Sequence, residues 1–121
     1  MRNGLARAVA AVAVILPLSV FSSSSASAQS RELWLFNGNA ETVSGYFLAG
    51  EQISGWCDSD CYDLDLVLVD GSGQSVSEDF LPDAVPVVTA PYSGQFSVRV
   101  IMANCAHSAG CAVSVDSTHG F

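Results

Sequence analysis

Lysine is absent from the 121 residues, and four arginines stand against twelve Asp and Glu. Affinity for nucleic acid depends on Lys and Arg side chains that replace counterions along the phosphate backbone. Docking on anionic lipid likewise needs a basic or strongly amphipathic face. The composition therefore excludes nucleic acid as a partner and argues against docking on an anionic membrane surface. It leaves an acidic chain of formal net charge −8, with room for one small domain.

The sequence also lacks an apolar run long enough to cross a bilayer. Residues 8–21 form an apolar stretch of about fourteen residues that contains Pro17, whereas a spanning helix needs roughly 20 residues. Two arginines precede the stretch, and small residues ending in Ala26-Ser27-Ala28 follow it. This pattern predicts a signal peptide over residues 1–28, cleaved on export, with a retained membrane anchor as the alternative.

The remaining residues, 29–121, are expected to form a single domain in a secreted or periplasmic location. Their net charge is −10, because only Arg31 and Arg99 offset the twelve acids. A domain of this size buries only roughly 60 to 65% of the surface of its unfolded chain, so covalent cross-links would add needed stability.

The four cysteines come as two short-range pairs, Cys57 with Cys61 and Cys105 with Cys111. In an exported chain an even number of cysteines indicates disulfides. A four-thiolate zinc site is the alternative, but it usually has two residues between paired cysteines, and here there are three and five. Crossed pairing would stabilise more, at about 4 kcal/mol against about 2 for a local pair. We nevertheless predict the two local pairs, because each pair brackets a turn between two strands. If neighbouring strands alternate in direction, both turns, and therefore both disulfides, lie at the same end of the domain.

Helical periodicity is missing after residue 28, and Gly, Ser and Pro interrupt the chain about every ten residues. Short segments rich in β-branched and aromatic residues fill the intervals and predict an all-β fold. We expect strands at 32–36, 42–48, 52–57, 63–69, 74–78, 85–89, 95–103 and 111–116.

Two of the expected strands carry an alternating apolar face. Leu64, Leu66 and Leu68 share one face, and the even positions from Phe96 to Met102 share another, so the two faces are expected to pack together in the core. Residues 70–73, Asp-Gly-Ser-Gly, are expected to form a hairpin turn. Evenly spaced short strands with such turns predict an antiparallel β-sandwich of jelly-roll type with about seven to eight strands.

The order of several motifs resembles the bacterial pre-peptidase C-terminal domain over about residues 42–116. The matching segments are 48–51, 57–66 with its Asp-Leu-Asp-Leu strand, 70–73, Asp79, 86–88 and the Gly-aromatic-x-Val-x-Val strand at 94–100. The resemblance implies a secreted jelly-roll sandwich that stands alone or is appended to peptidases. It also implies that some relatives bind collagen, carbohydrate or calcium. The two cysteine pairs and the missing peptidase domain set this sequence apart.

Four aspartates within eight residues, Asp58, Asp60, Asp63 and Asp65, are candidate calcium ligands, because calcium prefers clustered carboxylate oxygens. Their spacing is not that of an EF-hand loop. The alternative is structural: Asp58 and Asp60 would make hydrogen bonds in a turn, and Asp63 and Asp65 would lie on a solvated outer surface. No cofactor is otherwise required.

No catalytic residues are assigned. His107 and His119 are present, but the sequence has no Gly-x-Ser-x-Gly elbow and nothing orients a histidine beside a nucleophile. Five aromatic side chains are of the types that stack on sugar rings, but in a domain short of core we expect burial instead; they are Trp34, Tyr46, Trp56, Tyr62 and Tyr92. The expected function is that of a secreted, non-catalytic accessory or binding module for an extracellular or periplasmic protein or polysaccharide. The alternatives are a calcium-dependent carbohydrate or matrix binder and a small hydrolase.

Overall fold

The computed structural model describes residues 29–121, and the predicted signal peptide lies outside the described residues. The described chain folds into eight β-strands without a helix. The strands are β1 (Arg31–Leu35), β2 (Ala40–Phe47), β3 (Gln52–Cys57), β4 (Cys61–Val69), β5 (Ser75–Asp79), β6 (Val87–Thr89), β7 (Gly94–Cys105) and β8 (Cys111–Ser117). Within residues 29–121, no helix is long and apolar enough to cross a membrane.

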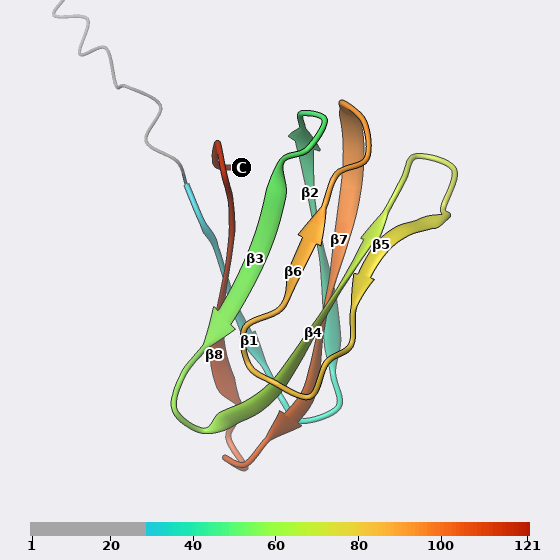
Figure 1. Ribbon diagram of the computed structural model, residues 1–121. Coiled ribbons are helices and arrows are strands. Elements are labelled where there is room, and N and C mark those ends of the chain that lie inside the picture. The colour runs from blue at the N-terminus through green and yellow to red at the C-terminus, as the bar shows by residue number, and fades with distance from the viewer. Residues whose placement is uncertain (1–28) are drawn as a thin grey trace, which may run out of the picture.

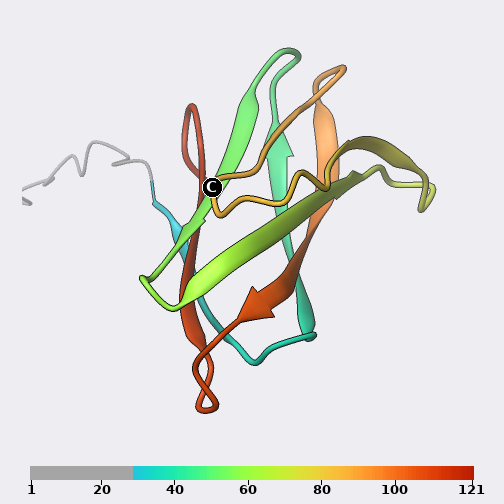
Figure 2. The same cartoon turned by 60° about the horizontal axis from the view of Figure 1, so that its bottom comes forward.

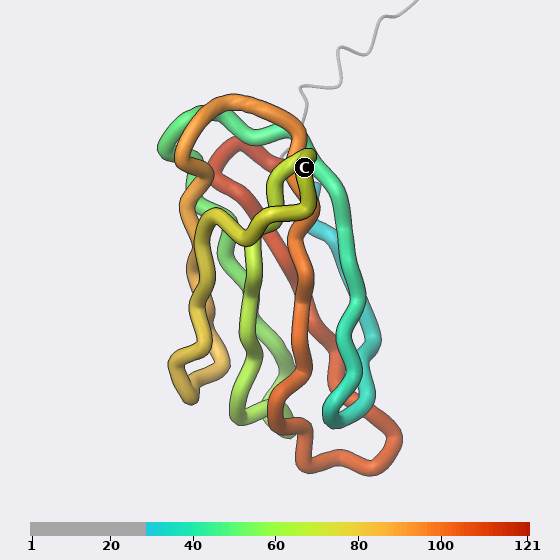
Figure 3. The backbone as a smooth tube through the Cα atoms, turned by 90° about the vertical axis from the view of Figure 1, so that its right-hand side faces the viewer, coloured from blue at the N-terminus to red at the C-terminus, as the bar shows by residue number. Residues whose placement is uncertain are grey.

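The strands form two antiparallel sheets of four that pack face to face (Figure 1). The first sheet has the order β1-β8-β3-β6 and the second the order β2-β7-β4-β5. Figure 3 faces the second sheet, with β2 in teal, β7 in orange, β4 in light green and β5 in yellow. Consecutive strands mostly lie in opposite sheets, and this order is that of a jelly roll. The predicted fold class is confirmed.

The core lies between the sheets and is built by strand alternation. On β4, Leu64, Leu66 and Leu68 are fully buried, and they face inward with the even positions of β7 from Phe96 to Met102. The register pairs Leu64 with Met102 and Leu66 with Val100, so the two predicted core faces belong to neighbouring strands of one sheet. The first sheet covers them from the other side with side chains such as Ile53, Val113 and Val115. Strand periodicity therefore identified the correct residues but not their relative position.

The predicted hairpin turn joins β4 and β5. Asp70 organises it, because its Oδ1 accepts hydrogen bonds from the backbone N–H of Ser72 at 2.8 Å and of Gln74 at 3.0 Å. Gly73 has a φ of +89°, a conformation that an L side chain rarely adopts. The predicted hairpin turn at residues 70–73 is therefore confirmed, with Asp70 as the hydrogen-bond acceptor and Gly73 at the position of positive φ.

All eight predicted strands exist, and the errors are at their ends. The strand expected from residue 85 begins only at Val87, because Pro86 precedes it and lacks the N–H that a strand ladder needs. Conversely, β7 continues to Cys105, two residues past its expected end, because Cys105 pairs with Cys61 in the register with β4.

Candidate functional site

The outer face of the first sheet carries both tryptophans of the chain. Trp34 on β1 lies opposite Ala112 on β8, and Trp56 on β3 lies opposite Ser114. Two strand spacings separate β1 from β3, so the tryptophans stand about 10 Å apart across the sheet, with β8 between them. Their β8 partners are two residues apart, so the pair is also offset by about 7 Å along the strands. We define this surface as the tryptophan face; its residues are Glu32, Trp34, Trp56, Val87, Ala112 and Ser114.

The prediction that the aromatic side chains are buried is wrong. Trp34 is 54% exposed and Trp56 is 55% exposed, and Tyr46, Tyr62 and Tyr92 are exposed to a similar degree. The core is filled by Leu, Val and Ile with two phenylalanines, Phe47 and Phe96. The exposure of Trp34 can be read from the alternation of side chains along β1. Leu33 and Leu35 flank Trp34 and face the core, so the indole between them faces outward.

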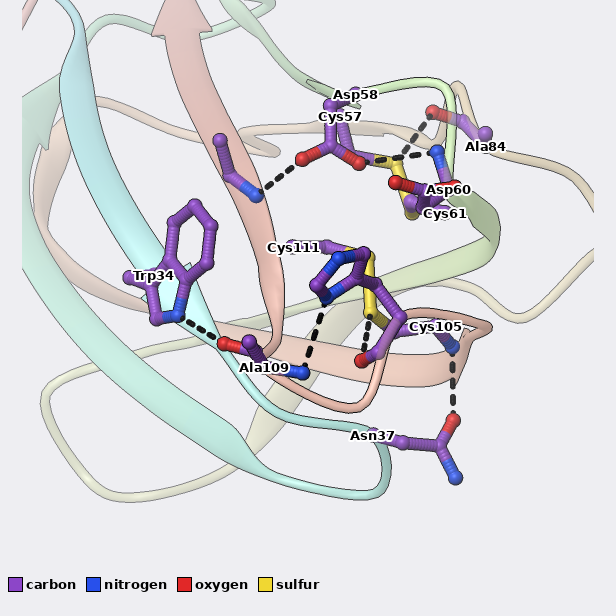
Figure 4. The surroundings of a disulfide bond; sticks show 12 residues. Trp34, Asn37, Cys57, Asp58, Asp60, Cys61, Ala84, Cys105, Ala109 and Cys111 are labelled. Carbon is purple, nitrogen blue, oxygen red and sulfur yellow. Dashed lines mark hydrogen bonds between the residues drawn. A yellow bond between two sulfur atoms is a disulfide. The ribbon is translucent and has the colours of Figure 1, made fainter.

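A loop from the far end of the chain holds the Trp34 indole in place. The Nε1–H of Trp34 donates a hydrogen bond to the carbonyl oxygen of Ala109 at 2.7 Å. Ala109 lies in the β7–β8 loop, as Figure 4 shows. The next residue, Gly110, has a φ of +100°, and a Cβ there would stand 2.5 Å from Nε1 of Trp34. The side chain is therefore exposed to solvent and fixed at one edge.

Polar side chains lie beside the tryptophans. The Oε2 atom of Glu32 accepts hydrogen bonds from the hydroxyl groups of Ser30 at 2.7 Å and Ser114 at 2.8 Å. These two bonds lower the pKa of the Glu32 carboxyl, which stays ionised at neutral pH. Asp116 follows Ser114 on the same face of β8. The face thus combines two aromatic surfaces with hydrogen-bond acceptors.

Both disulfides form as predicted, between Cys57 and Cys61 and between Cys105 and Cys111. They lie at one end of the sandwich, where the β3–β4 and β7–β8 loops meet; this end comes forward in Figure 2. Cys61 is the register partner of Cys105, which confirms that the two cross-links lie together. Since all four sulfurs are bonded to each other in pairs, the zinc alternative is excluded.

Asp58 joins the β3–β4 loop to β8 next to the tryptophan face. Its Oδ1 accepts the N–H of Asp60 at 3.1 Å, and its Oδ2 accepts the N–H of Ala112 at 2.8 Å (Figure 4). The backbone N–H of Asp58 donates in turn to the carbonyl of Ala112. Both carboxylate oxygens of Asp58 are therefore engaged in structural hydrogen bonds.

Asp63 and Asp65 lie apart from Asp58, on the outer face of the second sheet. The expected solvated position is wrong for Asp65, which is only 9% exposed. The chain after β5 runs along the edge of β4, where the N–H of Leu64 donates to the carbonyl of Asp83 at 2.9 Å. Burial, followed by the charge of neighbouring Asp63, raises the pKa of Asp65 to about 6. The Oδ1 atoms of both aspartates are buried and lack a hydrogen-bond partner.

The four predicted calcium ligands thus fall into two places. Among residues 29–121, no group of three or more His, Cys, Asp or Glu side chains is arranged to hold a metal ion. Calcium binding stays a prediction. Of the four candidates, Asp63 and Asp65 are the two with buried oxygens that lack a hydrogen-bond partner.

The histidines occupy structural positions. Nδ1 of His107 accepts the N–H of Ala109 at 3.0 Å within the β7–β8 loop, and the backbone N–H of His119 donates to Glu51 at 3.2 Å. An open depression of about 390 Å³ runs along β5, lined by Ser75, Val76, Ser77 and Glu78. These lining residues do not include a histidine or a cysteine.

The class of molecule is therefore a jelly-roll sandwich with two disulfides at one end and an exposed pair of tryptophans on one sheet. No model of a known protein family matches the chain, and no curated protein matches it. The likeness to the pre-peptidase C-terminal domain stays an interpretation of the motif order.

Proposed function

We propose that residues 29–121 act outside the cytoplasm as a non-catalytic binding module whose ligand contacts the tryptophan face. The observation that carries the proposal is the exposure of Trp34 and Trp56 on one sheet. Both would lower the free energy of the folded chain if they were inside a core, and contiguous apolar surface on a small protein commonly marks a site of interaction. Val87, which is 43% exposed and pairs with Ser54 of the strand that carries Trp56, adds apolar surface on β6.

Two further features support this function. The hydrogen bond from Trp34 to Ala109 fixes an exposed side chain before any ligand arrives, which lowers the entropy lost on binding. The two disulfides are compatible with an oxidising compartment, in agreement with the leader predicted at residues 1–28. The resemblance to the pre-peptidase C-terminal domain also implies an exported accessory module.

Export is tested by the mass of the protein recovered from the periplasm or medium. We expect a mature chain that begins at Gln29, because cleavage is predicted after Ala26-Ser27-Ala28. Recovery of a chain that still carries residues 16–21 would contradict export in this form and favour the membrane anchor.

Binding is tested by co-sedimentation of the purified protein with washed envelope and matrix material from the producing cells. We expect the wild-type protein to sediment and the double variant Trp34→Ala/Trp56→Ala to remain in the supernatant. Tyr46→Ala is the matched control, since Tyr46 is 60% exposed on β2 of the other sheet. If the double variant and the wild type sediment equally, the tryptophan face is not the binding surface.

A further inference from the structure

The shape of the tryptophan face restricts what it can bind. Trp34 and Trp56 stand on either side of β8, and the β8 residue opposite Trp34 is Ala112, whose side chain is a methyl group. Ser114 lies on the same face but is only 3% exposed, so it does not project between the indoles. The result is two aromatic surfaces with a low strip between them, which suits an extended, ring-containing ligand that crosses the strands.

The charge of the face restricts the ligand further. Glu32 is ionised and lies on β1 opposite Ser114, which is also the β8 partner of Trp56, and Asp116 continues the acidic side of the face. The two arginines of residues 29–121 lie elsewhere: Arg31 stands over the ring of Phe121, and Arg99 is opposite Val67 on the second sheet. A polyanion would meet carboxylates there with no cation to pair with it. Carboxylates instead accept hydrogen bonds from hydroxyl groups.

We propose that the tryptophan face binds an uncharged polysaccharide, whose sugar rings stack on Trp34 and Trp56 while Glu32 accepts hydrogen bonds from their hydroxyl groups. The C–H groups of a pyranose ring form an apolar face that packs against an indole, and its hydroxyls point outward toward acceptors. This inference rests on the proposed function and names its ligand class.

A second copy of this chain fits the face less well. In a two-fold contact the same patch meets itself, so Glu32 would approach Glu32 of the other copy. Each copy also carries a net charge of −10 over residues 29–121, which opposes association. An extended proline-rich peptide also stacks on tryptophan, but such peptides dock in aromatic-lined grooves, whereas the tryptophans here lie on the open surface of a sheet.

The test is native electrophoresis of the disulfide-intact protein in gels that contain a soluble polysaccharide. The neutral polymers are hydroxyethyl cellulose, a galactomannan, a β-1,3-glucan and a starch glucan, and the anionic comparison is polygalacturonate. We expect retardation by at least one neutral polymer and none by polygalacturonate. Trp34→Ala and Trp56→Ala should each weaken the retardation at least about tenfold, Trp56→Phe should weaken it less, and Tyr46→Ala should leave it unchanged.

Thermal midpoints equal to that of the wild type establish that the variants are folded. The proposal is overturned if no neutral polymer retards the protein, if the tryptophan variants migrate like the wild type, or if polygalacturonate alone retards it. A wild-type mass of two chains that becomes one in Trp56→Ala would identify a second copy as the occupant, and would also overturn it.

One comparison separates this inference from the proposed function. The envelope and matrix material is treated with periodate, which cleaves sugar diols, or with protease, before co-sedimentation. We expect periodate to abolish the binding that depends on the tryptophans. If protease abolishes it and periodate does not, the ligand is a protein, and the inference fails while the binding module stands.

Discussion

Asp65 is a carboxyl group that the fold removes from water without supplying a cation. It is 9% exposed, and Asp63, Asp79 and Asp83 contribute negative charge to its surroundings. Burial and these charges raise its pKa from the ordinary value of 3.8 to about 6. The native state therefore binds this proton more tightly than the unfolded chain does.

We expect the contribution of Asp65 to the stability of the protein to fall as the pH rises from about 4 to about 6, because Asp65 ionises in the unfolded chain before it ionises in the native one. Asp65→Asn removes this penalty, so the variant should be more stable than the wild type at pH 8, by on the order of 2 kcal/mol, and similar to it at pH 4. Urea unfolding at pH 4, 6 and 8 measures the difference. Glu41→Gln, an exposed substitution on β2, is the control. If the stability of Asp65→Asn and of the wild type changed with pH in parallel, Asp65 would not be the group with the raised pKa.

Calcium would act through the aspartates whose oxygens lack partners. We expect any rise in the thermal midpoint with millimolar calcium to disappear in Asp63→Asn and in Asp65→Asn, because their Oδ1 atoms are buried without a hydrogen bond. Asp58→Asn should keep the rise, since both oxygens of Asp58 accept backbone N–H groups. A shift that is lost only in Asp58→Asn would place the ion at the β3–β4 loop instead.

The β7–β8 loop positions one of the tryptophans, and Gly110 is the residue that permits the contact. Gly110→Ala should destabilise the protein by on the order of 1 kcal/mol or more through its positive φ, and its Cβ should also displace the Trp34 indole. Gly38→Ala is the matched control, because Gly38 has a φ of +84° with open space around its Cβ position. The fluorescence of Trp34, measured in a Trp56→Phe background, should change in Gly110→Ala alone. Equal spectra for the two glycine variants would contradict the contact.

The alternating pattern of the strands was sufficient to predict the eight elements, the inward leucines of β4 and the local disulfides. It was not sufficient to predict the raised pKa of Asp65, because Asp79 and Asp83, which contribute to it, lie far along the chain, and residues 80–86 return to the edge of β4 only in the fold. The fixed position of Trp34 was also out of reach, since its hydrogen-bond partner lies 75 residues along the chain. The exposure of the tryptophans was predictable in principle, because strand alternation places Trp34 outward, and the core is complete without them since aliphatic side chains and two phenylalanines fill it.

The whole molecule gains stability from its two short covalent loops. Replacing all four cysteines by serine should lower the free energy of unfolding by about 4 kcal/mol, from about 2 kcal/mol for each loop, which is a large part of the 5–15 kcal/mol typical of a small domain. Urea unfolding of this variant, beside the wild type with its disulfides intact, measures the loss. A decrease below about 1 kcal/mol would mean that the sandwich is held by its core alone.

The pairing of Cys61 with Cys105 in the sheet has a consequence for oxidative folding. Each native disulfide joins cysteines a few residues apart, so it can form while the chain is still unfolded, long before β4 and β7 meet. Once those strands pair, a thiol left at Cys61 or Cys105 faces the other cysteine directly and can exchange with it. Early oxidation at each loop therefore protects the chain from a swapped isomer in which Cys61 is joined to Cys105, and such an isomer would return to the native pairing only by thiol–disulfide exchange.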